Sequence, residues 1–155
     1  QAIRIKPDIA NIHYNLGVAY GESGKYEEAM EAFKQTIRID PDYLQAHYNL
    51  GGVYTRLGKY KEAIEAFRQV MRIDPDYALV RNNLGIAYGV LGKYKEAAEA
   101  FKQAIRINPD DAGAHLNLGI AYLSLNDRGS ALEQYKILKS LDPKLAKKLF
   151  SIISN

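Results

Sequence analysis

The sequence lacks cysteine and tryptophan, and it has no long apolar run. Without cysteine the chain can form no disulfide, no thiolate metal site and no cysteine nucleophile. No apolar stretch approaches the roughly 20 residues that a membrane-spanning helix needs. The 21 Lys and Arg nearly balance the 18 Asp and Glu, so charge alone does not indicate a nucleic-acid partner. With 47% apolar and 25% charged residues in a chain of 155, the composition also excludes a disordered or collagen-like protein.

The prolines recur at a constant interval of 34 residues, at Pro7, Pro41, Pro75, Pro109 and Pro143. Other residue types share this step. The columns are Leu16, Leu50, Leu84 and Leu118; Gly17, Gly51, Gly85 and Gly119; Tyr20, Tyr54, Tyr88 and Tyr122; Ala29, Ala63, Ala97 and Ala131; and the aromatic set Phe33, Phe67, Phe101 and Tyr135. A constant period of this length indicates an array of stacked repeats.

Each repeat is predicted to contain two helices. Apolar residues recur at helical spacing over residues 10–22 and at the equivalent positions of the later repeats, which predicts a first helix in each repeat. Gly24 and its equivalents suit the left-handed turn that ends a helix. A second helix is expected from near Tyr26 and stops before Asp40 and Pro41, because the residue before a proline is pushed out of the helical region.

The glycine column that starts at Gly17 lies inside the first helices, where glycine costs about 1 kcal/mol relative to alanine. We therefore expect close approach of the second helix at these positions. The alanine column that starts at Ala29 is the expected partner, since two small residues let two helices pack tightly.

These columns resemble the tetratricopeptide repeat: a leucine–glycine pair, a tyrosine three residues later, an alanine, an aromatic residue and a closing proline. The resemblance covers nearly the whole chain and implies an all-α fold, a right-handed α-solenoid of helix–turn–helix units. The expected organisation is a tail of a truncated preceding repeat at 1–9, repeats at 10–43, 44–77 and 78–111, a degenerate repeat at 112–143 and a C-terminal capping helix at 144–155.

The two ends are predicted to differ. Residues 1–8 nearly repeat residues 103–110, so we expect the chain to begin within a second helix, as a piece of a longer array. Its uncovered apolar end suggests end-to-end self-association. After Pro143, an amphipathic stretch is expected to cover the last repeat with Leu145, Leu149, Ile152 and Ile153, while Lys147, Lys148 and Ser151 face water. The alternative is a basic membrane-surface helix.

No catalytic or metal-binding arrangement is present in the sequence, so we predict no enzyme, no cofactor and no metal site. His13, His47 and His115 share one column with Arg81. Stacked helices lie about 8–10 Å apart, whereas zinc needs ligands near 2 Å, so these histidines are interpreted as packing residues. The arginine column that includes Arg38 is accompanied by Lys34, Arg68 and Lys102. Glutamates one helical turn before these three residues offset their charge, so no nucleic-acid partner is expected.

The resemblance implies that the first helices line a concave groove. Asn15, Asn49, Asn83 and Asn117 form a column on that face, and each amide offers both a donor and an acceptor to an extended peptide backbone. Alternatively, the amides bond to each other or to the neighbouring helix and fix the repeat geometry. The column is similar to that of O-linked N-acetylglucosamine transferases and of many bacterial repeat proteins. The lysine and arginine clamp of co-chaperones for a terminal carboxylate is absent.

The candidate peptide-binding residues are Asn11, Tyr14, Asn15, Gln45, Tyr48, Asn49, Thr55, Arg56, Asn82, Asn83, Ile86 and Asn117. Gly52 would leave room for a bulky side chain. The second half of the groove is expected to be more apolar, through Leu79, Ile86, Val90, Leu116, Ile120 and Leu123.

The predicted function is a non-catalytic, cytoplasmic protein–protein interaction scaffold that binds a peptide segment of a protein partner in the groove, with no membrane partner. The alternatives are a substrate-recruiting module of a larger enzyme, such as a glycosyltransferase, and a self-assembly module that associates through its exposed repeat ends.

Overall fold

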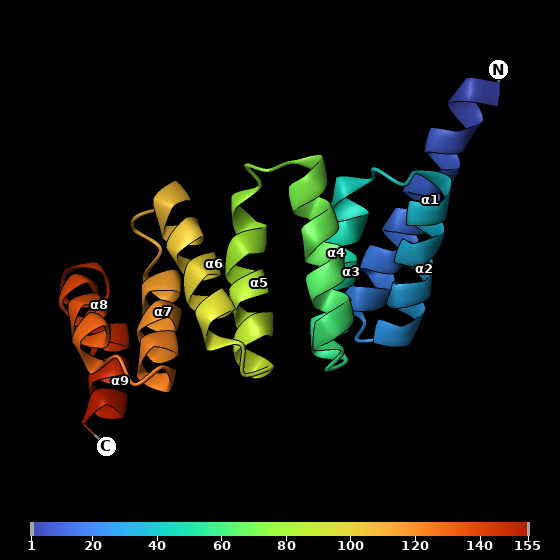
Figure 1. Cartoon of the computed structure of the whole chain (residues 1–155). Coiled ribbons are helices and arrows are strands. Elements are labelled where there is room, and N and C mark those ends of the chain that lie inside the picture. The colour runs from blue at the N-terminus through green and yellow to red at the C-terminus, as the bar shows by residue number, and fades with distance from the viewer. Residues whose placement is uncertain (1, 155) are drawn as a thin grey trace. The chain divides into compact units, whose positions relative to one another are not determined.

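The computed structural model describes residues 2–154, with side chains described from Asp8 onwards except for Ala78 (Figure 1). This part of the chain consists of helices joined by short turns and contains no strand. The helices are α1 (Ala2–Glu22), α2 (Tyr26–Ile39), α3 (Leu44–Arg56), α4 (Tyr60–Ile73), α5 (Ala78–Val90), α6 (Tyr94–Ile107), α7 (Ala112–Ser124), α8 (Arg128–Leu141) and α9 (Pro143–Ile153). The chain divides into two compact units, an N-terminal unit (Gln1–Val80) and a C-terminal unit (Arg81–Asn155).

The turns inside the helix pairs have the backbone geometry that the sequence predicts. Gly24, Gly58 and Gly92 have φ between 71 and 72°, the left-handed region in which glycine has no Cβ to clash. After Gly24, the Lys25 N–H donates to the Tyr20 carbonyl at 2.9 Å and closes the end of α1. Asn126 replaces the turn glycine in the last repeat, with φ of 60°. Asparagine is the residue that adopts this conformation most readily after glycine.

Two helix pairs form the N-terminal unit. The helix α2 packs against both α1 and α3, and α3 packs against α4. Its core contains Ala29 and Phe33 of α2 together with Ala46, Leu50 and Val53 of α3. The helix α2 therefore joins the first helix of its own repeat to the first helix of the next.

The first helix is longer than predicted. Residues Asp40, Asp74 and Asn108 leave the helical region before their prolines, as expected, but α1 runs unbroken from Ala2 through Pro7 to Glu22. The helix boundary expected at residue 9 is therefore wrong. Pro7 lies in the second turn of α1, and the backbone is helical on both sides of it.

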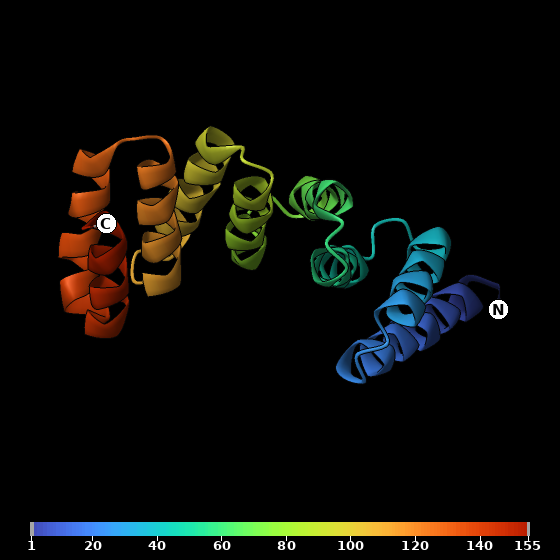
Figure 2. The same cartoon turned by 90° about the horizontal axis from the view of Figure 1, so that it is seen from below.

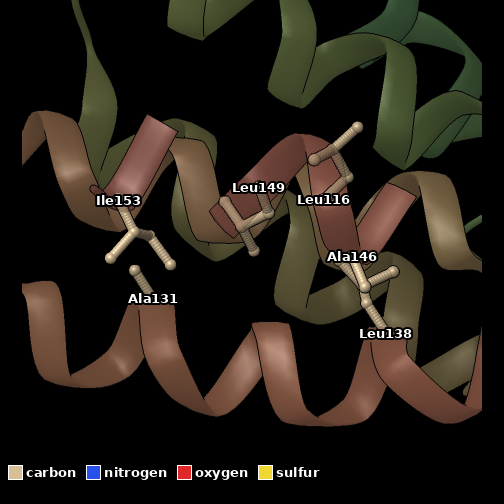
Figure 3. Close-up of a cluster of buried hydrophobic side chains, with 6 residues drawn as sticks. All are labelled: Leu116, Ala131, Leu138, Ala146, Leu149 and Ile153. Carbon is tan, nitrogen blue, oxygen red and sulfur yellow. The ribbon is translucent and has the colours of Figure 1, made fainter. Parts of the chain in front are cut away.

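In the C-terminal unit, α7 packs against α6, α8 and α9, and both cartoon views show α9 beside α8 (Figures 1 and 2). In Figure 3, Ala131 and Leu138 of α8 point toward Ile153 and Ala146 of α9. Leu116 of α7 and Leu149 of α9 complete this buried cluster. The helix α9 thus covers α7 and α8.

The apolar face of α9 differs slightly from the prediction. Leu149 and Ile153 are buried, and Leu145 is half-buried, but Ile152 is 40% exposed. Successive helical residues are rotated by about 100°, so Ile152 falls outside the stripe that faces α7 and α8.

Three of the four mid-helix glycines of the column face aromatic rings instead of the alanine column. A Cβ added to Gly17 would lie 2.7 Å from Cε1 of Phe33, and Gly51 and Gly85 face Phe67 and Phe101 in the same way. At Gly119, the neighbour is Cδ2 of Leu149, at 2.6 Å. The predicted close approach is confirmed, but its partner was wrong: a large ring needs the space that a missing Cβ leaves, whereas an alanine methyl does not.

Candidate protein-binding site

The first helices of the N-terminal unit, α1 and α3, present a connected network of tyrosines and asparagines. The rings of Tyr14 and Tyr43 are stacked with their centroids 5.0 Å apart. Asn49 donates its Nδ2 hydrogen to the Tyr14 hydroxyl at 3.1 Å, and the Tyr43 hydroxyl donates to Oδ1 of Asn11 at 2.8 Å. Burial raises the pKa of Tyr43, and a tyrosine hydroxyl is protonated at neutral pH even at its ordinary pKa of about 10, so it remains a donor. Three predicted residues are therefore brought together by a tyrosine that the prediction missed.

The aromatic pairing recurs in the next repeat, still within the N-terminal unit. Tyr48 packs against Phe67 at 6.2 Å and against Tyr77 at 5.4 Å, measured between ring centroids. Burial raises the pKa of Tyr77 as it does that of Tyr43. The signal that could have identified both residues is their own spacing of 34 positions, immediately before the first helices.

The other predicted residues of this unit lie on the same two helices in different environments. Asn15 and Gln45 are exposed, and so is Arg56. The Thr55 hydroxyl donates to the Gly51 carbonyl at 2.9 Å, within its own helix, so its hydrogen is used there. A Cβ added to Gly52 would meet no heavy atom within 4 Å, which leaves open space at this position.

In the C-terminal unit, the first helices α5 and α7 border a slot with a volume of about 190 Å³. Phe101 and Ala97 of α6 lie among its lining residues. The remaining lining residues are Gly85, Ile86, Gly89, Val90, Tyr94, Asn117, Ile120, Ala121 and Ser124. The slot is mostly apolar, with the Asn117 amide as its most versatile polar group, and it contains the predicted residues Ile86 and Asn117.

The asparagine column makes contacts between repeats. Nδ2 of Asn117 donates to Oδ1 of Asn82 at 3.3 Å, which matches the bond from Asn49 to Tyr14 in the other unit. In both cases the acceptor lies in the preceding first helix, one position before the asparagine of the same column. Asn83 is half-buried. Asn15 is the exposed member of the column, and its side chain makes no hydrogen bond with the part of the chain that the structure describes.

Leu116, which was expected in the groove, is 6% exposed and lies in the core beneath α9. That assignment was wrong, because the covering helix α9 buries the face of α7 on which Leu116 lies. Leu79 and Val90 are exposed, at 62% and 56%, and Leu123 is half-buried.

The histidine column supports the turns between repeats. Nε2 of His47 lies 2.8 Å from the Pro41 carbonyl, and Nε2 of His115 lies 2.9 Å from the Pro109 carbonyl. His115 also contacts Oε1 of Gln134 through Nδ1 at 2.8 Å. Each ring thus contacts the backbone of the loop that precedes its own helix. No cluster of three or more metal-ligating side chains is found among the described residues.

A larger cavity, of about 460 Å³, lies between α2, α3 and α4 in the N-terminal unit. Its floor includes Ile37 and Leu50, and its rim carries Lys34 and Glu65. These rim charges already form ion pairs within their own helices, with Glu31 at 3.0 Å and Arg68 at 3.1 Å. None of the predicted peptide-binding residues lines this cavity, and we therefore place the candidate site at those residues on the first helices instead.

None of the described helices is long and apolar enough to cross a membrane.

The comparison with family models identifies one family. Models described as tetratricopeptide repeats match residues 1–31, 42–110 and 82–146, and a TPR repeat model matches 20–58. A comparison with curated proteins finds no match. Among solved structures, one titled "Crystal structure of MamA" is 26% identical over 94% of this chain and 85% of that chain, with a TM-score of 0.85.

Two further solved structures are similar. "MamA 41-end from Desulfovibrio magneticus RS-1" is 24% identical over 87% of this chain and 76% of its own, with a TM-score of 0.83. "MamA MSR-1 C2" is 27% identical over 87% and 78%, with a TM-score of 0.80. These structural similarities confirm the α-solenoid fold of helix–turn–helix units. The four family matches together run from residue 1 to residue 146. The chain belongs to the tetratricopeptide repeat family.

Proposed function

We propose that this protein is a non-catalytic interaction scaffold that binds an extended segment of a partner protein along its first helices. The tetratricopeptide repeats and the similarity to MamA structures support a protein-interaction scaffold. The location of binding is our proposal. It rests on the amides and apolar side chains that α1, α3, α5 and α7 present.

The slot between α5 and α7 is the observation that carries the proposal. Its volume of about 190 Å³ can admit an aliphatic side chain, and Ile86 and Val90 on its border are 37% and 56% exposed. Burying a leucine or isoleucine side chain there would contribute about 1.5–3 kcal/mol to binding. The Asn117 amide in the same wall can bond to the backbone of the bound segment, at a net ~0.5–1.5 kcal/mol for each hydrogen bond.

The hydrogen bonds of the asparagine column support a dual role. Asn49 and Asn117 each use one amide hydrogen to join neighbouring first helices. An asparagine side chain has a second amide hydrogen and a carbonyl oxygen, so these bonds hold the amide in one orientation and leave hydrogen-bonding capacity for a ligand. Such prior ordering lowers the entropic cost of binding.

The proposal is tested by placing a charge in the slot. Ile86→Glu is compared with Ile107→Glu, a matched change at the end of α6, where the isoleucine is 43% exposed and lies outside the slot. Both variants are first checked for helical content by circular dichroism. Affinity capture from a lysate, quantified by mass spectrometry, should then lose partners with Ile86→Glu and keep them with Ile107→Glu. Equal capture by the two variants would contradict binding at the slot.

Self-association is a second candidate function, favoured by one observation. Ile9, Ile12 and Leu16 form an exposed row on α1, at 40%, 64% and 43%. The positions 34 residues later are Tyr43, just before α3, and Ala46 and Leu50 within α3, and all three contribute to the core packed against α2. The α1 row therefore matches a surface that elsewhere receives a second helix, and a second copy of the chain could supply one.

Light scattering over a range of protein concentrations tests this candidate. The expected result is a molar mass that rises with concentration for the unmodified protein and stays at the monomer value for Ile12→Glu. A constant monomer mass for the unmodified protein would rule the candidate out.

A further inference from the structure

The C-terminal pair of helices carries the net positive charge of this protein. Residues 128–154 contain six Lys and Arg but only two acidic residues, Glu133 and Asp142. The whole chain has a net charge of +3, so the remainder has no positive excess. This asymmetry concentrates a positive potential on α8 and α9, where it can attract an anionic partner.

Both acidic residues in this region are already engaged. Glu133 pairs with Lys136 at 2.6 Å. Asp142 caps α9 by accepting hydrogen bonds from the backbone N–H groups of Lys144 and Leu145, at 2.9 and 3.1 Å. Four exposed lysines have no ion pair with any residue that the structure describes: Lys139, Lys144, Lys147 and Lys148.

Apolar side chains border these lysines. On α9, Lys144, Lys147 and Lys148 share the side opposite the buried stripe, and 100° per residue places Phe150 on one edge of that side and Ile152 on the other. Phe150 is 49% exposed and Ile152 is 40% exposed.

Tyr135 extends this surface onto α8. Its ring lies 5.2 Å from that of Phe150, and the Lys139 ammonium lies 5.8 Å from its centroid. Unpaired positive charge and exposed apolar surface therefore meet across the two helices. We name the surface formed by Tyr135, Lys139, Lys144, Lys147, Lys148, Phe150 and Ile152 the basic end face.

We propose that the basic end face docks an acidic segment of a partner protein in which apolar residues alternate with aspartate or glutamate. Charge complementarity selects the acidic side chains, and Phe150 and Ile152 provide contacts for the apolar ones. A membrane surface is the less favoured occupant. The main apolar stripe of α9 is buried against α7 and α8, which leaves only the two edge residues to insert.

Fluorescence anisotropy tests the proposal with a short labelled peptide of alternating glutamate and leucine. The comparison peptide has glutamine in place of glutamate, and vesicles of phosphatidylserine and phosphatidylcholine serve as the membrane probe. The test variant is Lys147→Glu with Lys148→Glu. The matched control is Lys59→Glu with Lys93→Glu, which makes the same change in net charge at two exposed positions outside the basic end face.

The acidic peptide should bind the unmodified protein saturably, and the glutamine peptide should not bind. The Lys147 and Lys148 variant should weaken binding about tenfold or more, because two attractive charges become repulsive, while the control variant changes it less than about twofold. Phe150→Ser should also weaken binding. Equal losses in the two double variants would overturn the proposal, since only net charge would then matter. Binding to vesicles without binding to the peptide would also overturn it.

Discussion

Two adjacent glycines in α3 should respond to alanine with opposite signs. A Cβ on Gly51 would lie closer than 3.0 Å to ring carbons of Phe67, whereas a Cβ on Gly52 would have no heavy atom within 4 Å. Both substitutions gain about 1 kcal/mol from helix propensity. Only Gly51→Ala also introduces overpacking, which typically costs about 1–3 kcal/mol. The Phe67 side chain is 1% exposed, so its ring can move only if the surrounding core moves with it.

We therefore expect Gly52→Ala to stabilise the protein by up to about 1 kcal/mol and Gly51→Ala to destabilise it by up to about 2 kcal/mol. The propensity gain cancels when the two variants are compared, so their difference measures the packing cost directly. Urea unfolding followed by circular dichroism gives both values from the midpoints and slopes.

A double variant identifies the ring as the cause. Phe67→Leu should lose stability alone but should lose less in the Gly51→Ala background, because the smaller side chain frees the space that the new methyl group needs. If Gly51→Ala is as stabilising as Gly52→Ala, the contact with Phe67 does not explain the glycine column, and the reasoning is refuted.

Three further predictions concern the asparagine column, the α9 cap and acid stability. Asn49→Ala should cost about 0.5–1.5 kcal/mol in urea unfolding through its lost bond to Tyr14, whereas Asn15→Ala should leave stability unchanged and weaken partner capture. Asp142→Ala should cost about 0.5–2 kcal/mol, because it removes the cap of α9, and a midpoint equal to that of the unmodified protein would contradict this. The Ser130 hydroxyl donates to Asp127 at 2.6 Å and lowers the pKa of that carboxyl. The hydrogen bond to the ionised Asp127 therefore stabilises the fold above the ordinary pKa of the carboxyl, and this contribution is lost as the pH falls below about 4. Ser130→Ala should make unfolding less sensitive to pH in that range, as measured by urea titration at several acidic pH values.

Much of the local structure could be predicted because its causes lie within a few residues of each other. The turn glycines at Gly24, Gly58 and Gly92 and the helix ends before Pro41, Pro75 and Pro109 follow from backbone sterics alone. Pro7 is the exception, since the same rule predicts a helix boundary that α1 does not have.

The candidate site was predictable in part. Residue spacing places Asn11, Tyr14 and Asn49 on first-helix faces, and the structure joins all three in one network. Their link, Tyr43, was missed because it lies before α3 rather than within the expected stripe. Leu116 satisfied the same spacing as the groove residues, yet it is buried by α9.

The sequence by itself determined the 34-residue repeat, the two-helix unit and the left-handed turns, because each depends on periodicity or on local backbone geometry. Only the tertiary structure decided which side chains fill the space beside each glycine, which asparagines bond across repeats and which apolar residues of α9 stay exposed. These outcomes depend on side chains from helices that are distant in sequence. Gly119 shows the difference: its neighbour is Leu149 of α9, although the repeat pattern places the aromatic Tyr135 in the corresponding column.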